Sequence, residues 1–112
     1  MKVLVIDDER SIREHLDMFL QERRFEVLSA ECGESGLKLI KEKEPDIVIL
    51  DIRLPGIDGL EVLRRLKREN SKVNVIMITA FHDMDTTIQA MKLGAYDYIH
   101  KPLDIDQLEI VL

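Results

Sequence analysis

The feature that most constrains this chain is the alternation of five short apolar runs with longer charged segments. The runs cover 3–6, 25–29, 47–50, 73–78 and 96–99. Such runs, separated by helical segments, are typical of βα units that build a parallel sheet. The run 47–50 reads Ile-Val-Ile-Leu without a polar residue, which indicates a central strand covered on both faces. The sequence therefore predicts an α/β fold with helices on both sides of the sheet.

The segments between the runs carry helical patterns. In the first of them, apolar residues recur with helical spacing at Ile12, Leu16, Phe19 and Leu20. Helices are predicted over about 10–23, 34–43, 59–69 and 84–94. The same spacing returns at Ile105, Leu108 and Leu112. Because the sequence stops there after about two turns, we expect a last helix that is truncated. Residues 1–112 are expected to form one domain, cut from a longer protein.

Composition excludes several classes of protein. The chain has 16 basic and 22 acidic residues, a net charge of −6, so it lacks the positive surface that binds nucleic acid or anionic membranes directly. It has no apolar stretch approaching the ~20 residues of a membrane span and no signal peptide, which predicts a cytoplasmic protein. The single cysteine, Cys32, has no partner for a disulfide or a zinc site.

Polar residues follow four of the predicted strands: Asp7 and Asp8, Asp51, Thr79, and Lys101. Ligands of open parallel sheets bind at the carboxyl ends of the strands, beside the point where the strand order reverses. With the order 2-1-3-4-5, the three carboxylates share one pocket and repel one another. A hard cation with oxygen ligands, together with Lys101, would keep them ionised. Mg²⁺ is the expected occupant, and it leaves Asp51 free to act on a phosphoryl group.

Each of these residues also has an ordinary interpretation when taken singly. Asp7 and Asp8 suit the start of a helix, and Asp51 suits a turn. Thr79 suits a strand, and Lys101 suits a solvated surface. Independent roles of this kind do not require all five residues to fall at the ends of four strands. The combination therefore favours a functional site.

The sequence closely resembles a response-regulator receiver domain of two-component signalling. The resemblance covers residues 3–112 and rests on four motifs: Asp7-Asp8, D-I-R-L-P-G-I-D-G at 51–59, Thr79-Ala80, and G-A-Y-D-Y-I-H-K-P at 94–102. It implies a flavodoxin-like fold, a three-layer sandwich with the sheet order 2-1-3-4-5. The motifs are most similar to those of the nitrogen-regulator type.

The resemblance implies a role for each site residue. Asp51 would accept a phosphoryl group from a phosphohistidine of a sensor histidine kinase. Mg²⁺ would be bound by Asp8, Asp51 and the main-chain carbonyl of Arg53, and by Asp7 through water. Thr79 and Lys101 would contact the phosphoryl oxygens, with a cis bond from Lys101 to Pro102. Arg53 and Phe81 would occupy positions that tune the lifetime of the phosphate.

The resemblance also implies how phosphorylation becomes a signal. Thr79 would turn toward the phosphoryl group, and Tyr98 would move into the vacated space. The surface of the 84–94 helix, the 96–99 strand and the last helix would then change. Apolar and aromatic groups on that surface are offered by Met84, Ile88, Met91, Tyr96 and Tyr98.

The implied function is that of a signalling receiver, which catalyses only its own aspartyl phosphorylation and dephosphorylation. Its partners would be a sensor histidine kinase and an output domain that controls transcription. In the nitrogen-regulator type, that output is an AAA+ ATPase followed by a helix-turn-helix. A receiver homodimer formed on phosphorylation is a further candidate, whereas this domain itself would bind neither nucleic acid nor membrane.

Three other functions require sequence features that differ from those of this chain. A phosphatase similar to the haloacid dehalogenases needs a second acid two residues after the nucleophile, where this chain has Arg53. A flavodoxin needs a Ser/Thr/Gly-rich phosphate loop after the first strand, where this chain has Asp7-Asp8-Glu9-Arg10. A pseudo-receiver, which binds partners without chemistry, loses acidic or lysine positions, and none is lost here.

Overall fold

The computed structural model describes the backbone of residues 1–112 and every side chain except those of residues 81 and 105. Its strands form one parallel sheet in the order β2-β1-β3-β4-β5, as the sequence predicts. The strands are β1 (Lys2–Ile6), β2 (Glu26–Ala30), β3 (Ile47–Asp51), β4 (Asn74–Thr79) and β5 (Asp97–His100). The helices are α1 (Arg10–Glu22), α2 (Gly33–Lys43), α3 (Gly59–Arg68), η1 (Phe81–Asp83), α4 (Met84–Leu93) and α5 (Ile105–Val111).

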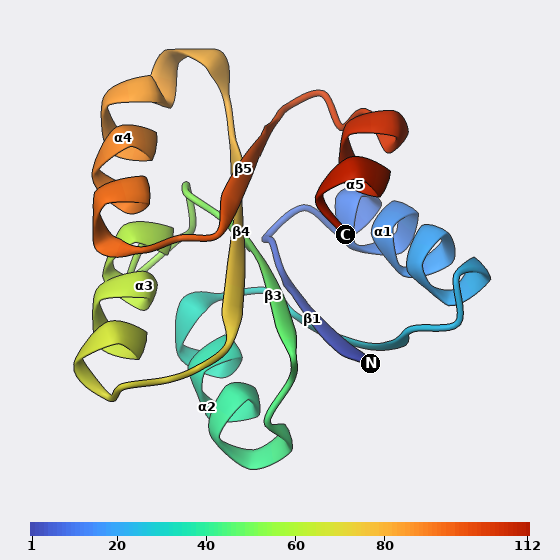
Figure 1. Cartoon of the computed structure of the whole chain (residues 1–112), viewed down its shortest axis with the longest axis horizontal. Helices are drawn as coiled ribbons and strands as arrows, with labels where there is room; N and C mark the ends of the chain where they lie inside the picture. The colour runs from blue at the N-terminus through green and yellow to red at the C-terminus, as the bar shows by residue number, and fades with distance from the viewer.

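The helices cover both faces of the sheet, as Figure 1 shows. One layer is formed by α1 and α5, and the opposite layer by α2, α3 and α4. Successive residues of β1 alternate between the two cores. Leu4 and Ile6 pack with the second layer, and Val3 and Val5 with the first. The predicted three-layer sandwich is therefore confirmed.

The register of the sheet brings the carboxyl ends of its central strands to one edge. Ile6 of β1 pairs with Leu50 of β3, and Leu50 pairs with Met77 of β4. Residues that follow these positions therefore lie side by side at that edge. This alignment positions the candidate site.

Three strands begin and end one residue later than predicted. In β2 the ladder starts where Glu26 pairs with Lys2, while Phe25 packs against the apolar core beneath α1. At β5, Tyr96 precedes the strand and its side chain is exposed. An apolar or aromatic residue just before a strand thus fits the strand pattern in the sequence, although it lies outside the hydrogen-bonded ladder. The corresponding shift in β4 makes Thr79 the last residue of that strand.

Helix α5 follows Asp104, whose carboxylate accepts a hydrogen bond from the amide of Asp106 at 2.9 Å. Leu108 is buried against the first layer, and Leu112 packs beside it. The side chain of Ile105, the first member of the predicted repeat, lies outside the described side chains. Within the described residues, no helix has the length and hydropathy that crossing a bilayer requires.

Gly59, the first residue of α3, allows this helix to start in contact with the end of β3. A Cβ atom at this position would lie 2.2 Å from the main-chain oxygen of Asp51. The amide of Gly59 donates to the carbonyl of Ile52 at 2.8 Å, and Asp58 caps the helix by accepting from the amide of Glu61. Because Gly59 has no side chain, the β3–α3 loop can pack closely against the end of β3, beside the site.

Candidate functional site

Three carboxylates meet at the carboxyl edge of the sheet. Asp51 ends β3, and Asp7 and Asp8 directly follow β1. Each offers an oxygen, and these oxygens lie within 4.8 Å of one another. Asp7 and Asp51 are buried, whereas Asp8 is exposed. The structure thus brings together the acidic residues that the sequence places at the ends of neighbouring strands.

Of the described side chains, Lys101 alone contributes an ammonium group to this cluster. Its Nζ donates to Asp51 Oδ2 at 3.0 Å and lies 3.7 Å from Asp7 Oδ2. The main-chain amide of Lys101 donates to the carbonyl of Thr79 at 2.8 Å, which attaches the β5–α5 loop to the end of β4. The bond from Lys101 to Pro102 is cis, as the resemblance predicts.

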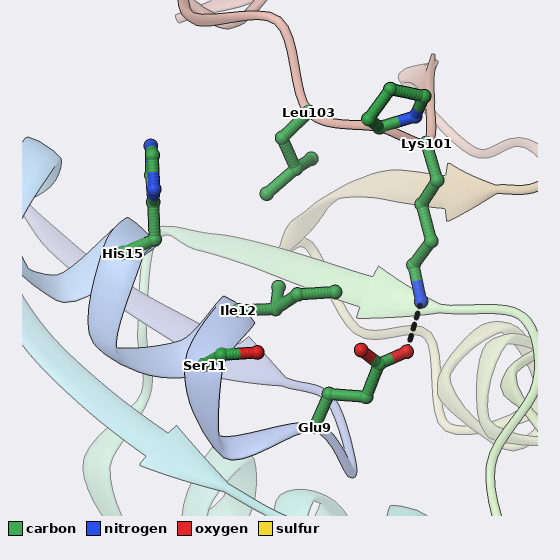
Figure 2. Close-up of a pocket in the computed structure, with 7 residues that line it drawn as sticks. Glu9, Ser11, Ile12, His15, Lys101 and Leu103 are labelled. Atoms are coloured by element: carbon green, nitrogen blue, oxygen red, sulfur yellow. Dashed lines mark hydrogen bonds and ion pairs between the residues drawn. The ribbon is translucent and has the colours of Figure 1, made fainter.

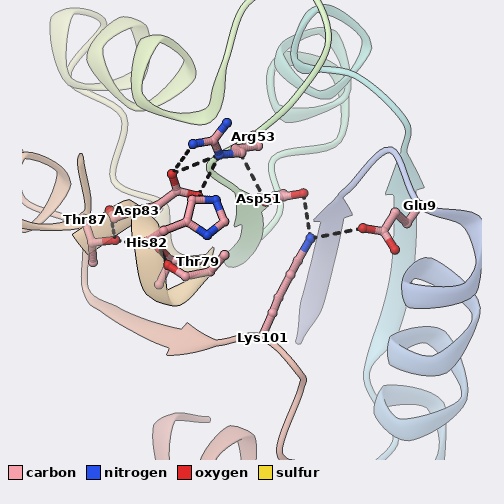
Figure 3. Close-up of polar contacts among 9 residues, drawn as sticks. Glu9, Asp51, Arg53, Thr79, His82, Asp83, Thr87 and Lys101 are labelled. Carbon is pink, nitrogen blue, oxygen red and sulfur yellow. Dashed lines mark hydrogen bonds and ion pairs between the residues drawn. The ribbon is translucent and has the colours of Figure 1, made fainter. Parts of the chain in front are cut away.

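Glu9 is a fourth carboxylate that the sequence analysis did not include. Its Oε1 lies 3.5 Å from the ammonium of Lys101, as Figure 3 shows. The ammonium group of Lys101 therefore forms ion pairs with Asp51, Asp7 and Glu9. The site carries an excess of negative charge.

Burial and crowding of charge change the pKa values in this cluster. Burial raises the pKa of Asp7 to about 6, and the neighbouring charges of Asp51 and Asp8 add to this rise. Burial also raises the pKa of Asp51, partly offset by Lys101. Burial alone would lower the pKa of Lys101, but its hydrogen bond to Asp51 and the surrounding carboxylates raise it. Lys101 therefore stays protonated among these carboxylates.

The residues at this edge fit a hard divalent cation. Asp7 Oδ2 is buried and makes no hydrogen bond within the described part of the protein, although ionised oxygens of this kind require a partner. The oxygens offered by Asp7, Asp8 and Asp51 are the ligand type that Mg²⁺ prefers. The main-chain amide of Arg53 donates to Asp51 Oδ1 at 3.2 Å, so this loop lies beside the carboxylates. The carbonyl of Arg53 as a ligand stays a prediction.

The backbone that carries the acidic pair is held by α1 and β2. The guanidinium of Arg13 donates to the carbonyl of Asp7 at 2.8 Å. The amide of Asp7 donates to the carbonyl of Ala30 at 3.2 Å, and the amide of Glu9 donates to Asp7 Oδ1 at 2.9 Å. These contacts hold the carboxylate of Asp7 toward the site despite the repulsion there.

The side chain of Arg53 turns away from the carboxylates to Asp83 (Figure 3). Its Nε lies 2.9 Å from both oxygens of Asp83, and its Nη2 lies 2.7 Å from Oδ1. This bidentate contact lowers the pKa of Asp83. It joins the β3–α3 loop to the start of α4. Sequence reasoning missed Asp83 because an acid before a helix is usually a simple cap.

The hydroxyl of Thr79 does not contact the carboxylates in this structure. Thr79 Oγ1 lies 2.7 Å from Thr87 Oγ1 of α4 and 3.1 Å from the carbonyl of Ala80. The chain thus carries Thr79 to the correct edge of the sheet, but its hydroxyl is bound elsewhere. Thr87 was also missed, since a threonine within a helix gives no signal in the sequence.

The predicted signalling surface divides into exposed and packed residues. The side chains of Ile88 and Tyr96 are exposed, whereas Met91 and Tyr98 pack against the core. The ring of Tyr98 meets that of His100 edge to face, with 5.4 Å between ring centroids. Among the described side chains of this surface, the exposed large apolar groups are therefore Ile88, Tyr96 and also Ile110 of α5. The side chain of Phe81, predicted to tune phosphate lifetime together with Arg53, lies outside the described side chains.

A pocket opens beside Lys101, between the start of α1 and the β5–α5 loop. Figure 2 shows the side chains of Ile12 and Leu103 in this pocket, with Glu9 and Lys101 joined at its rim. His15 stands at its outer side. This apolar pocket leads from solvent to the ammonium group of the site.

Comparison with known proteins identifies the family. Residues 3–112 match the family described as response regulator receiver domain. The chain belongs to this family. The receiver domain is 33% identical to Regulatory protein AtoC of Escherichia coli (strain K12) over 99% of this chain. It is 34% identical to Sporulation initiation phosphotransferase F of Bacillus subtilis (strain 168), covering 96% of this chain and 86% of that protein.

Solved structures agree with this assignment. A response regulator receiver domain protein from Clostridium thermocellum has a TM-score of 0.92 at 37% identity, covering 98% of this chain and 89% of that chain. NtrX from Brucella abortus has a TM-score of 0.91 at 36% identity, covering 98% and 25% of the two chains. Among relatives of the nitrogen-regulator type, this receiver spans 24% of AtoC and 22% of NtrC from E. coli (strain K12).

Proposed function

We propose that this receiver domain accepts a phosphoryl group on Asp51 and thereby controls an output domain. The observation that carries the proposal is the environment of Asp51. It is a buried carboxylate at the end of β3, 3.0 Å from the ammonium of Lys101 and clustered with Asp7 and Asp8. Receiver domains pair with sensor histidine kinases, and we infer that the donor here is a phosphohistidine of such a kinase.

The transfer consists of one displacement at phosphorus. An oxygen of Asp51 attacks, a P–O bond forms, and the P–N bond to the donor imidazole breaks. A carboxylate is a weak nucleophile toward an anionic group, so charge neutralisation accounts for most of the catalysis. Lys101 supplies one positive charge next to Asp51. A kinase would approach this lysine through the pocket lined by Ile12 and Leu103.

Mg²⁺ is the cofactor that we propose for this site. Asp8, Asp51 and the main-chain carbonyl of Arg53 would bind it directly, and Asp7 through water. The bound ion would supply positive charge that offsets the repulsion between Asp51 and the phosphoryl oxygens. The buried Oδ2 of Asp7, which makes no hydrogen bond within the described part of the protein, supports this assignment.

The signal would pass from the site to the surface of α4, β5 and α5. Thr79 is proposed as the group that senses the phosphoryl oxygens and Tyr98 as the side chain that responds. Ile88 and Tyr96, exposed on this surface, would contact the output domain or a second receiver. By analogy with AtoC and NtrC, that output would be an AAA+ ATPase with a helix-turn-helix. Residues 1–112 would form its receiver domain.

The environment of Arg53 opposes the phosphatase alternative. A phosphatase of the haloacid dehalogenase type requires an acid at this position, whereas the guanidinium here is bound to Asp83. The pseudo-receiver alternative predicts the same fold without phosphorylation. Phosphorylation itself is therefore the property to measure.

Incubation with acetyl phosphate and Mg²⁺ is expected to add one phosphoryl group to the protein. Acetyl phosphate needs no partner protein, so the receiver's own residues supply the catalysis. Intact-protein mass spectrometry measures the gain, and EDTA should prevent it because the crowded carboxylates then lack their counter-ion. The product should be lost in alkali, as expected for an acyl phosphate. No gain in mass with Mg²⁺ would favour the pseudo-receiver.

A further inference from the structure

The contacts of Thr79 form a small buried network with the start of α4 (Figure 3). The hydroxyl oxygens of Thr79 and Thr87 are 2.7 Å apart, and both residues are only 1% exposed. Thr87 Oγ1 also lies 2.9 Å from the carbonyl of Asp83, one helical turn earlier. Thr79 Oγ1 lies 3.1 Å from the carbonyl of Ala80. The protein therefore supplies a partner for each of the two buried hydroxyls.

The number of protons in the network limits what Thr79 can do. Each hydroxyl has one proton to donate, and the two carbonyls can only accept. If Thr87 donates to Asp83, Thr79 donates to Thr87; if Thr87 donates to Thr79, Thr79 donates to Ala80. Under both assignments the Thr79 proton is used inside the network. A phosphoryl oxygen on Asp51 also accepts only, so Thr79 must release its present acceptor before it can contact that oxygen.

We propose that Thr87 is a positioning residue that holds the hydroxyl of Thr79 away from Asp51 in the resting receiver. The proposal rests on the roles proposed above for Asp51 and Thr79. The contact between the two threonines stabilises the resting arrangement only, since it is lost when Thr79 turns to the phosphoryl group. Thr87 therefore sets how strongly a phosphoryl group must bind to switch the domain.

The salt bridge between Arg53 and Asp83 fixes Thr87 in this role. Asp83 is 7% exposed and bound at both oxygens by Arg53, whose loop directly follows Asp51. The start of α4 is therefore held against the β3–α3 loop. Because Thr87 bonds to the carbonyl of the same Asp83, its hydroxyl is held at a defined place opposite Thr79. Two contacts thus connect the start of α4 to the site. Asp83 binds Arg53 of the β3–α3 loop, and Thr87 binds Thr79 at the end of β4.

The test compares Thr87→Val with Thr87→Ser in the whole chain. Valine keeps the shape of threonine and removes the hydroxyl, whereas serine keeps the hydroxyl. Beryllium fluoride with Mg²⁺, a noncovalent analogue of the phosphoryl group, gives an equilibrium affinity. We expect Thr87→Val to bind it about fivefold more tightly, the effect of removing one ordinary buried hydrogen bond from the resting state. Thr87→Ser should bind it as the wild type does.

A second measurement separates positioning from a general loss of packing. In the free protein, the NMR signal of the Thr79 amide should move toward its bound position in Thr87→Val and stay in place in Thr87→Ser. Gln89→Ala is the matched control, because Gln89 lies on the same helix with its side chain exposed to solvent. It should leave both readouts unchanged. If Thr87→Val impairs folding, Thr87→Ala removes the same hydroxyl in a smaller side chain.

The outcomes distinguish this proposal from the function on which it rests. A wild type that takes no phosphoryl group from acetyl phosphate would refute the proposed function, and the role of Thr87 with it. If the wild type is phosphorylated but the variants without the Thr87 hydroxyl bind beryllium fluoride as the wild type does, only the positioning role of Thr87 would be overturned. An equal gain in Thr87→Val and Gln89→Ala would also overturn it, because the effect would not depend on the Thr79 contact.

Discussion

Replacing Asp51 with asparagine is expected to reduce phosphorylation by acetyl phosphate by roughly 1000-fold or more, because the nucleophile is lost. The asparagine amide has the shape of the carboxylate, so the core around β3 should stay intact. Its nitrogen carries no negative charge and does not attack phosphorus. The rate of labelling, followed by intact-protein mass in excess Mg²⁺, measures this effect.

Asp58→Asn provides the matched control for this substitution. Asp58 lies seven residues further along the chain and caps α3 by accepting from the amide of Glu61. Asparagine caps helices as well as aspartate does, so this variant should be labelled at the wild-type rate. Labelling of a folded Asp51→Asn protein at the wild-type rate would exclude Asp51 as the acceptor.

Replacing Asp7 with asparagine is expected to stabilise the metal-free protein at neutral pH. The pKa of Asp7 is raised from 3.8 to about 6, chiefly by burial. Keeping this group ionised in the folded state therefore costs up to about 3 kcal/mol. Asparagine removes that charge and still accepts from the amide of Glu9. Chemical unfolding in EDTA, with the wild type beside the variant, measures the gain in the free energy of unfolding.

The pH dependence of this gain has a defined sign. Below pH 3.8 Asp7 is protonated in both states and costs nothing; the cost grows as the pH rises and is complete above about pH 6. The advantage of Asp7→Asn should therefore appear between these values and vanish in acid. Asp8→Asn removes the same charge from an exposed neighbour and should change stability little. A destabilised Asp7→Asn protein at pH 7 would contradict the account of burial and repulsion.

The sequence predicts the sheet and the acidic cluster because both follow from local pattern. Runs such as Ile-Val-Ile-Leu at 47–50 mark buried strands, and the position of a residue at a strand end determines at which edge it lies. Asp7, Asp8, Asp51 and Lys101 are therefore brought together once the strand order is known. The strand boundaries were less certain, because Phe25 is apolar whether it lies in the ladder or beside it.

The sequence does not predict the contacts that depend on side-chain direction. Glu9 is an exposed acid whose role appears only when Lys101 folds over the sheet edge. Asp83 ends η1 and Thr87 lies on α4. The placement of these helices is a tertiary property, and Arg53 and Thr79, the partners of the two side chains, lie on other elements. Nor does the sequence indicate that the hydroxyl of Thr79 is bound to Thr87 in the unphosphorylated protein. Competition for one buried proton is not visible in a residue pattern.

The measurement that tests the central claim most directly is chemical trapping of the acyl phosphate. The wild-type protein is phosphorylated with acetyl phosphate and Mg²⁺, reduced with borohydride, digested and sequenced by mass spectrometry. Hydride reduces an aspartyl phosphate to the alcohol, homoserine, and releases phosphate, so the residue loses one oxygen and gains two hydrogens. We predict this change at Asp51, and in EDTA none. Homoserine at another aspartate, with Asp51 unchanged, would contradict the account.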